Sequence, residues 1–574
     1  MRENFKEKAV LGLCTLGLIG MGSCLKIDDA YDLEKEIDKT ITVGGDLTLP
    51  GSNTEQMLLG DLLELDKDGV IQANEISGDY ALVKEGIQEN TEVEIPDVTL
   101  DMSGGFYGFT ISEEIMGIPL KNVETEIKES IKIDVRQGGL SSIIQDINNG
   151  STICEETYLR LSKSGVNGVS ARMEDGYRIV FPEYVRVISE NADWTGEGNK
   201  LVLNRAGGLE IEENTAIKFQ IVYVDFTKEG AEFVYNADET DNSSINLSGE
   251  ILFDGKIIVN SDGTDSGMLE LHINVDSQKL IIEEVNAVVK PVIDLKVEPI
   301  EITDLPDFLA SNDVKLDLTD PRIFITLTNP STLSVNMSAA LKSSKTGYED
   351  RTAVVPEFNI PAQCENFMIC INQIKEGDEL GIRYVKVDNL SRIIENVPER
   401  IEIYDIVTNV VQEPVDIRLN DVFTITTDYK VNTPLMFGAD TRINYSKTID
   451  GWNTDLENAE FKAVEASMKI INKIPLGVNL TAVAIDKEGK ELQGVKVDMD
   501  VNIEPGSIEV PTEKEIAFTV TTESGSIKGL DGIILNVKAW SRENTENVAL
   551  NENQTMQFTD IKLKLKGGVT MDLN

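Results

Sequence analysis

Short runs of alternating apolar and polar residues follow one another along most of the chain. Examples are residues 91–95, 200–203, 217–224 and 245–253. A period of two places successive side chains on opposite faces of a strand. Clusters of Gly, Asn and Asp, such as residues 260–264, separate the runs as turns do. The pattern predicts a mostly β protein, built from several β-sandwich-like (immunoglobulin-like) modules in series.

One pair of runs predicts a β-hairpin. Residues 245–253 and 256–259 both alternate and flank Asp254-Gly255, a dipeptide typical of two-residue hairpin turns. Helical spacing is rare, and we expect short helices only at residues 54–65, 140–147, 305–310 and 390–396.

Two stretches in the second half of the chain resemble each other at a constant offset of 143 residues. Residues 325–339 and 468–482 each contain an apolar strand pattern, a turn with Asn and Pro, and a second alternating strand. We interpret them as two related modules, although strand-rich segments can also resemble each other by chance. The expected divisions are a signal segment at 1–23, a tether at 24–44, an N-terminal mixed domain at 45–152, a β-rich domain at 153–301, and related modules at 302–430 and 431–574.

The composition restricts the partners. The 574 residues include 52 basic and 100 acidic ones, a formal net charge of −48, and 41% are hydrophobic. Such a charge repels nucleic acid and opposes lying flat on an anionic membrane, so we expect neither. The apolar fraction is large enough for packed cores. These properties suit an acidic ectodomain held away from a membrane.

Histidine and cysteine are scarce. The single histidine, His272, lies in an alternating run and is expected on a partly exposed strand; sites built on several histidines are excluded. Beyond the first 24 residues, the cysteines are Cys154, Cys364 and Cys370. We expect them to be isolated small apolar residues rather than a disulfide framework.

The first residues have the layout of a secretory signal. Residues 2–8 are polar and slightly basic, residues 9–21 are uncharged, and the small residues Gly22 and Ser23 precede Cys24. The uncharged run is too short to span a bilayer, which requires about 20 apolar residues.

Met21-Gly22-Ser23-Cys24 resembles the lipobox of bacterial lipoproteins, in which the cysteine becomes the lipid-carrying first residue. Lys26-Ile27-Asp28-Asp29 looks like the export signal of Bacteroidetes surface lipoproteins. The resemblance implies acyl chains such as palmitate on Cys24 and a place on the outer face of the outer membrane; each buried CH₂ contributes about 0.8 kcal/mol to anchoring. The alternatives are an ordinary cleaved signal and a solvated acidic tether.

Residues 64–75 resemble an EF-hand calcium loop. Glu64, Asp66 and Asp68 take the first three ligand positions, Val70 would offer its carbonyl oxygen, and Glu75 takes position 12. Position 1 is Glu rather than Asp, and no helix is expected after Glu75. An acidic turn is therefore the alternative to a calcium site. No other cofactor is expected.

Two tryptophans, Trp194 and Trp452, lie in polar stretches beside Asp or Asn. Such rings can stack on sugars, although a loop tryptophan more often closes the end of a sandwich. No Gly-rich phosphate loop, HExxH or GxSxG motif is found, and we expect no enzyme.

Together these features predict a lipid-anchored cell-surface lipoprotein with a binding or structural role: adhesion, glycan capture, or partnership in an envelope complex. Its expected partners are the membrane, through the lipid, and a glycan or protein. A carboxylate-based glycoside hydrolase and a carrier of apolar ligands are the alternatives.

Overall fold

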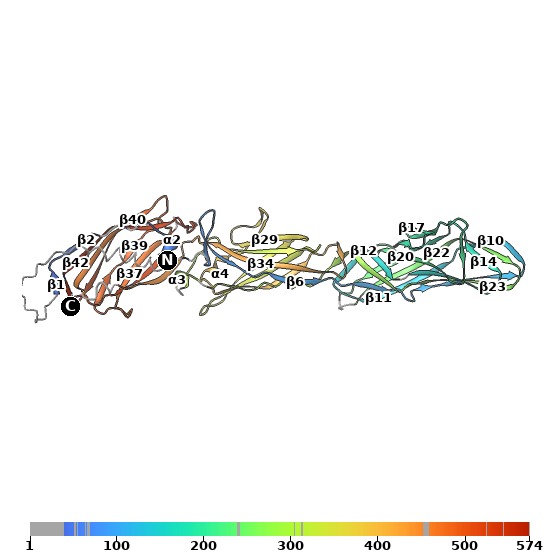
Figure 1. Ribbon diagram of the computed structural model, residues 1–574, viewed down its shortest axis with the longest axis horizontal. Helices are drawn as coiled ribbons and strands as arrows, with labels where there is room; N and C mark the ends of the chain where they lie inside the picture. Colours follow the sequence, from blue (N-terminus) through green and yellow to red (C-terminus); the bar gives the residue numbers. More distant parts are fainter. Residues whose placement is uncertain are drawn as a thin grey trace, which may run out of the picture.

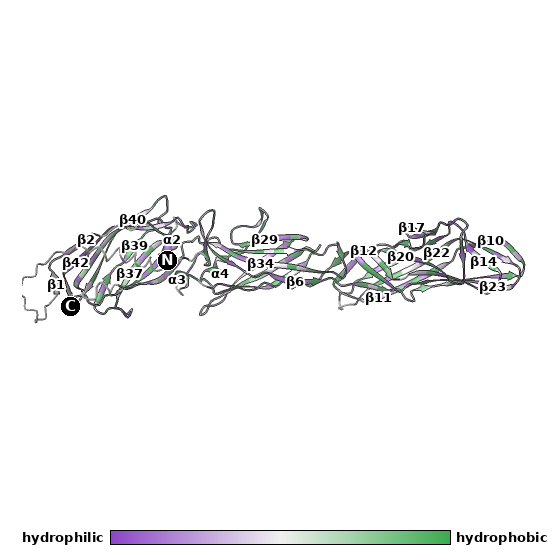
Figure 2. Cartoon of the chain, in the orientation of Figure 1, coloured by the Kyte–Doolittle hydropathy of each residue, from purple (hydrophilic) through white to green (hydrophobic). Residues whose placement is uncertain are grey.

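The computed structural model describes residues 40–50, 53, 55–63, 65, 69–155, 157–237, 242–303, 305–310, 314–451, 459–523, 525–542 and 545–572. In this part of the chain, strands dominate and helices are single turns. The molecule is a rod of three modules joined end to end (Figure 1). Apolar and polar residues alternate along the strands of all three (Figure 2). The expected mostly β, multi-module fold is confirmed.

The base module lies at one end and contains a seven-stranded and a four-stranded sheet among the described residues. Its elements are β1 (Thr40–Val43), β2 (Leu47–Pro50), β3 (Met57–Leu58), α2 (Leu59–Leu62), β35 (Arg442–Ile449), β36 (Ala459–Asn472), β37 (Gly477–Ile485), β38 (Val495–Asp498), β39 (Val501–Ile503), β40 (Thr512–Thr522), β41 (Gly532–Trp540) and β42 (Thr555–Asp572).

The middle module contains an eight-stranded and a four-stranded sheet, counted over the same described ranges. Its elements are β4 (Ile71–Ala73), β5 (Tyr80–Glu85), β6 (Glu89–Glu94), β25 (Ile300–Glu301), α3 (Asp307–Ala310), β26 (Arg322–Asn329), β27 (Val335–Ser344), β28 (Arg351–Ile360), β29 (Cys364–Asn372), β30 (Gly377–Glu379), β31 (Ile382–Lys386), α4 (Leu390–Ile394), β32 (Arg400–Val410) and β34 (Val422–Pro434).

The distal module, at the other end, contains a ten-stranded and a nine-stranded sheet within the described residues. Its elements are β7 (Val98–Asp101), β8 (Phe106–Tyr107), β9 (Phe109–Met116), β10 (Pro119–Ile127), β11 (Ser130–Leu140), β12 (Ile144–Glu155), β13 (Tyr158–Ser164), β14 (Val169–Met173), β15 (Arg178–Val180), β16 (Val185–Ser189), β17 (Trp194–Glu197), β18 (Lys200–Leu203), β19 (Leu209–Ile211), β20 (Thr215–Asp225), β21 (Ala231–Val234), β22 (Ser243–Asp262), β23 (Ser266–Asp276), β24 (Lys279–Val289) and β33 (Val415–Arg418).

The chain runs from the base to the far end and back. β1 and β2 pair with β42, the last strand; β5 and β6 pair with β34; and β7 pairs with β24. The stretch 45–152, expected to be one domain, therefore contributes strands to all three modules. The nesting replaces the serial order expected at residues 152, 301 and 430. Local patterns do not show it, because they do not identify which distant strands pair.

The two stretches offset by 143 residues have equivalent pairing. β26 pairs with β29 and β34, and β36 pairs with β40 and β42. The second strand of each stretch keeps its register: Val335 lies opposite Ile360, and Val478 lies opposite Ile503. The predicted similarity of these two stretches therefore extends to their three-dimensional pairing.

A buried asparagine makes the same hydrogen bonds in both copies. The Asn329 amide donates to the carbonyl oxygens of Leu333 at 2.8 Å and Pro361 at 3.0 Å. Its counterpart Asn472 donates to the carbonyl oxygens of Leu476 at 3.1 Å and Glu504 at 2.8 Å. Both asparagines are fully buried. The side chain satisfies carbonyl groups at the corner between the two sheets that would otherwise be buried without a partner.

The hairpin expected at Asp254-Gly255 is wrong, because β22 continues through this dipeptide. A Cβ atom at Gly255 would lie 2.4 Å from Cδ2 of Tyr177, whose ring is buried. The glycine therefore allows an aromatic ring to lie against the strand, rather than a turn. The helix expected at 140–147 is also wrong, since these residues belong mainly to β11 and β12; α2, α3 and α4 lie within the other three expected helices.

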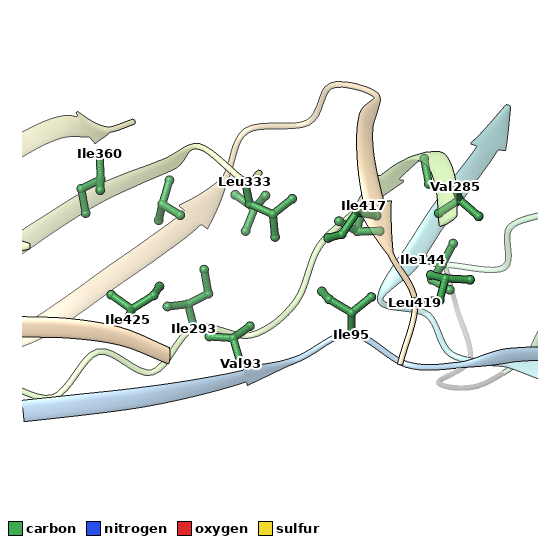
Figure 3. Close-up of a cluster of buried hydrophobic side chains, with 14 of the residues drawn as sticks. Val93, Ile95, Ile144, Val285, Ile293, Leu333, Ile360, Ile417, Leu419 and Ile425 are labelled. Carbon is green, nitrogen blue, oxygen red and sulfur yellow. The ribbon is translucent and has the colours of Figure 1, made fainter. Parts of the chain in front are cut away.

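An apolar core joins the middle and distal modules (Figure 3). Ile95, Ile417 and Leu419 are buried between side chains of both modules, such as Val93 and Val285. β33 arrives from the middle module and pairs antiparallel with β24 of the distal one. Continuous hydrogen bonding and burial across the joint hold the two modules as one body.

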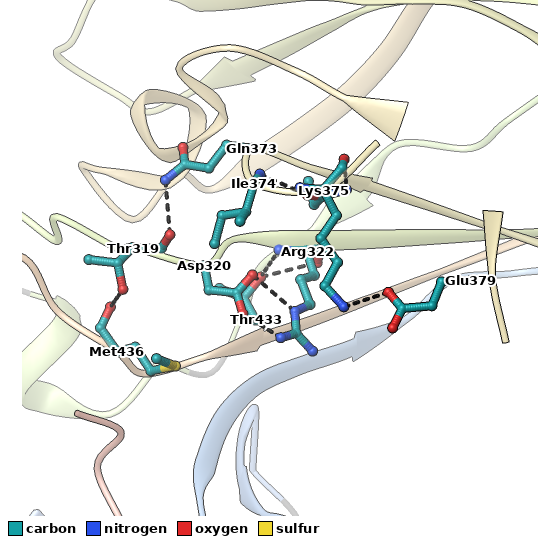
Figure 4. Close-up of polar contacts among 10 residues, drawn as sticks. Thr319, Asp320, Arg322, Gln373, Ile374, Lys375, Glu379, Thr433 and Met436 are labelled. Atoms are coloured by element: carbon teal, nitrogen blue, oxygen red, sulfur yellow. Dashed lines mark hydrogen bonds and ion pairs between the residues drawn. The ribbon is translucent and has the colours of Figure 1, made fainter. Parts of the chain in front are cut away.

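Polar contacts dominate at the end of the middle module that faces the base (Figure 4). The Thr319 amide donates to the Met436 carbonyl oxygen at 3.0 Å, and the Arg322 amide donates to Thr433 Oγ1 at 3.0 Å. The Arg322 guanidinium forms a two-point ion pair with Asp320, a geometry that adds orientation to attraction. These bonds fix β26 and β34 where the chain passes into the base module.

Candidate functional site

Several residues singled out in the sequence lie outside the part of the chain that the structure describes. They are Cys24, Glu64, Asp66, Asp68 and Trp452. Within the described part, no helix has the length and apolar character needed to cross a membrane.

The described part of the calcium-like loop consists of Val70 and Glu75. The Val70 carbonyl oxygen accepts the Val83 amide at 2.7 Å, within the pairing of β4 and β5. Glu75 lies in an exposed turn, which Asn74 closes by accepting the amide of Ile76 at 3.0 Å. A strand, not a helix, follows the loop. Over the described ranges, no group of three or more His, Cys, Asp or Glu side chains could hold a metal ion.

Trp194 is buried, with 5% of its surface exposed, at the start of β17 opposite Leu203. Its indole Nε1 has no hydrogen-bond partner. A ring in this position cannot lie against a sugar, so the predicted stacking role fails for Trp194. It closes part of the distal core, as the alternative interpretation expects.

His272 lies on the outer face of β23. Its Nδ1 is 2.8 Å from Thr110 Oγ1, and its Nε2 is 3.4 Å from Ser164 Oγ and 3.5 Å from the Glu270 carboxylate. A Ser-His-acid relay needs the acid and the nucleophile on opposite ring nitrogens, whereas both lie beside Nε2 here. The residue is a partly exposed strand residue, as the alternation predicts. The cysteines of the described part, Cys154, Cys364 and Cys370, are free, also as expected.

A polar hollow of about 610 Å³ opens on the side of the distal module. It is lined by Thr99, Asp101, Ser103, Gly104, Gln137, Val275, Asp276, Ser277, Gln278 and Lys279. Several of these groups are already engaged: Gln137 Oε1 accepts the Asp101 amide at 3.2 Å, and Asp276 pairs with Arg160 at 3.0 Å. Hydrogen bonds from Ser103 hold the pKa of the Asp101 carboxyl below its usual range. No aromatic ring lines the hollow, and its polar groups satisfy one another.

The far end of the distal module is built from three short crossovers. Residues 117–118 join β9 to β10, residues 165–168 join β13 to β14, and residues 263–265 join β22 to β23. β9, β23 and β13 are neighbours in one sheet, and β10, β22 and β14 are neighbours in the other. Each crossover therefore connects the same two sheets at the same end, opposite to β1 and β42 (Figure 1).

Side-chain carboxylates hold these crossovers together. Asp265 accepts the Asn167 amide at 3.2 Å and the Ser266 amide at 2.9 Å, so it ties two crossovers to each other. Asp262 accepts the Thr264 amide at 2.9 Å. These hydrogen bonds lower the pKa of both carboxyl groups, which are therefore charged at neutral pH. The far end is a preformed surface.

Three large apolar side chains are exposed on this surface. Met116, Ile118 and Met268 are 71%, 54% and 48% exposed, and we call them the tip patch. Ser266 lies opposite Met116, so Met116 and Met268 share the outer face of the β9–β23 pair. Ile118 continues the apolar surface around the turn at Gly117. The sequence did not reveal the patch, because its residues come together only when β9 pairs with β23.

The sequence matches no protein-family model, and none of the curated proteins matches it. Among solved structures, one match is a protein from Parabacteroides distasonis ATCC 8503, provisionally described as secreted. The two share 18% sequence identity with a TM-score of 0.34, over 49% of this chain and 86% of the other. A match at this level says nothing about what the protein does.

Proposed function

We propose that the protein is a lipid-anchored lipoprotein of the cell surface, with a binding rather than a catalytic role. Acyl chains on Cys24 hold it in the outer membrane, and the three modules carry the tip patch away from the lipid. A protein or glycan partner binds at the distal module.

The observation that carries this proposal is the position of the two ends. Thr40 lies opposite Asp572, in the pairing of β1 with β42 at the base. The tether of residues 24–39 therefore joins the rod at the end opposite to the tip patch. A lipid on Cys24 would place the base near the membrane and the patch far from it.

The charge supports the same orientation. A net charge of −48 disfavours contact between the rod and an anionic lipid surface. An acidic rod tethered at one end is therefore repelled away from the membrane rather than held against it.

Protease shaving of intact cells tests the proposal. We expect the wild-type protein to fractionate with the outer membrane and to be digested by external protease. Cys24→Ala should release it from the membrane fraction, because the acyl chains supply the anchor. Wild-type protein that is anchored but protected from protease would place it inside the envelope and refute surface exposure. Unchanged fractionation of Cys24→Ala would refute the lipid anchor.

A further inference from the structure

The tip patch is unusual in its surroundings. It is exposed at the end of a strongly acidic rod, and the crossovers beneath it are fixed by the Asp265 hydrogen bonds. A preformed surface loses little conformational freedom on binding. Two of its three side chains are methionines, whose flexible thioethers adapt to partners of different shape.

Acidic side chains surround the patch. They are Glu113, Glu114, Asp262, Asp265 and Glu270. The neighbouring basic residues are fewer: Lys121 on β10, and Lys163, whose ammonium donates to the Val169 carbonyl oxygen at 2.6 Å. Glu114 lies directly opposite Met268. The surface is thus an apolar centre inside a negatively charged rim.

We propose that the tip patch is a docking surface for a protein partner that presents apolar side chains among lysines and arginines. The apolar residues would be buried at the centre of the contact. The carboxylates would attract the partner and select its charge. This inference rests on the proposed surface role and specifies the chemistry of the partner.

Two other occupants fit the surface less well. A second copy of the chain would bring two negative rims together, which costs free energy. A glycan would favour an aromatic platform, but the three crossovers contain no Phe, Tyr or Trp. A basic protein surface satisfies both the apolar centre and the charged rim.

The test uses the full chain released from lipid by Cys24→Ala, and two fluorescent synthetic peptides that alternate Leu with Lys or Leu with Glu. Fluorescence anisotropy measures binding. We expect the Leu–Lys peptide to bind, and Met116→Ser combined with Ile118→Ser to weaken it at least tenfold. Val354→Ser combined with Val407→Ser is the matched control, because both residues are exposed on the middle module. It should leave the affinity within twofold.

A second pair of changes separates charge from burial. Glu113→Gln combined with Glu114→Gln should weaken the Leu–Lys peptide and flatten its dependence on salt, because rim charges act through screened attraction. Circular dichroism confirms that each variant is folded.

Several results would overturn the inference. One is equal binding of the Leu–Lys peptide to the tip variant and the wild type. Others are equal binding of the Leu–Glu peptide, a dimer in sedimentation that the tip variant abolishes, or glycan-array binding lost in that variant. Protease shaving is independent of these residues, so failure here leaves the surface-lipoprotein proposal standing.

Discussion

At the scale of single residues, one buried side chain explains a feature of the sequence. Asn329 and Asn472 occupy the same place in two similar stretches, and each satisfies two carbonyl groups at a sheet corner. Neither is exposed, and their hydrogen bonds lie inside the modules. Such a residue is kept for structure rather than for binding a partner.

Asn329→Ala should destabilise the middle module by about 1–3 kcal/mol, because the carbonyl groups of Leu333 and Pro361 would lose their buried donor. Native-state hydrogen exchange resolves the modules and should show faster exchange in β26 and β27, with little change in β36. Asn409→Ala is the control, since that side chain is exposed in the same module. Equal protection in wild type and Asn329→Ala would show that the corner hydrogen bonds contribute nothing.

At the scale of elements, the sequence identifies strands but not their partners. The alternating pattern locates β20 and both halves of β22 correctly. It does not show that the two halves are continuous, because Asp-Gly is typical of turns and the packing need of Tyr177 is non-local. For the same reason the tip patch escaped prediction: β9 and β23 are distant in sequence.

Glu395 makes the contact after α4 dependent on pH. Burial alone would raise the pKa of its carboxyl, but hydrogen bonds from Lys315, at 3.1 Å, and from Arg351 outweigh burial and lower it. A carboxyl whose folded pKa is depressed stabilises the protein above its unfolded pKa of about 4.3. That stability is lost as the pH falls through the lower, folded pKa.

Glu395→Gln should therefore reduce the stability of the middle module at pH 7 and flatten its loss between neutral and acidic pH. Urea unfolding at a series of pH values measures both effects. Glu349→Gln removes an exposed carboxylate of the same module and serves as the control. Parallel pH profiles for Glu395→Gln and the wild type would refute this role.

At the scale of the whole molecule, nesting brings the two ends of the described chain together. The base is formed by β1, β2 and the C-terminal strands, whereas the tip is formed by residues from the first half of the chain. The apolar core of Figure 3 and the polar contacts of Figure 4 make the joints between modules continuous. A rod of this kind holds its two ends far apart.

Spin labels can measure this separation. Labels at Thr48→Cys and Lys562→Cys should give a short distance, because both positions are exposed on the paired strands β2 and β42. Labels at Thr48→Cys and Ile118→Cys should lie beyond the measurable range. The unsubstituted chain controls for labelling of the native cysteines. A short distance in the second pair would mean that the rod folds back on itself.

The nested path also determines when each part can be completed during synthesis. Apart from β33, every strand of the distal module has been made once Val289 is reached, and the middle module is complete at Pro434. The base needs β42, which ends at Asp572, so β1 and β2 are made first and paired last. The part nearest the membrane is therefore the last to fold, and a chain cut short before β42 would leave its earliest strands without their partner.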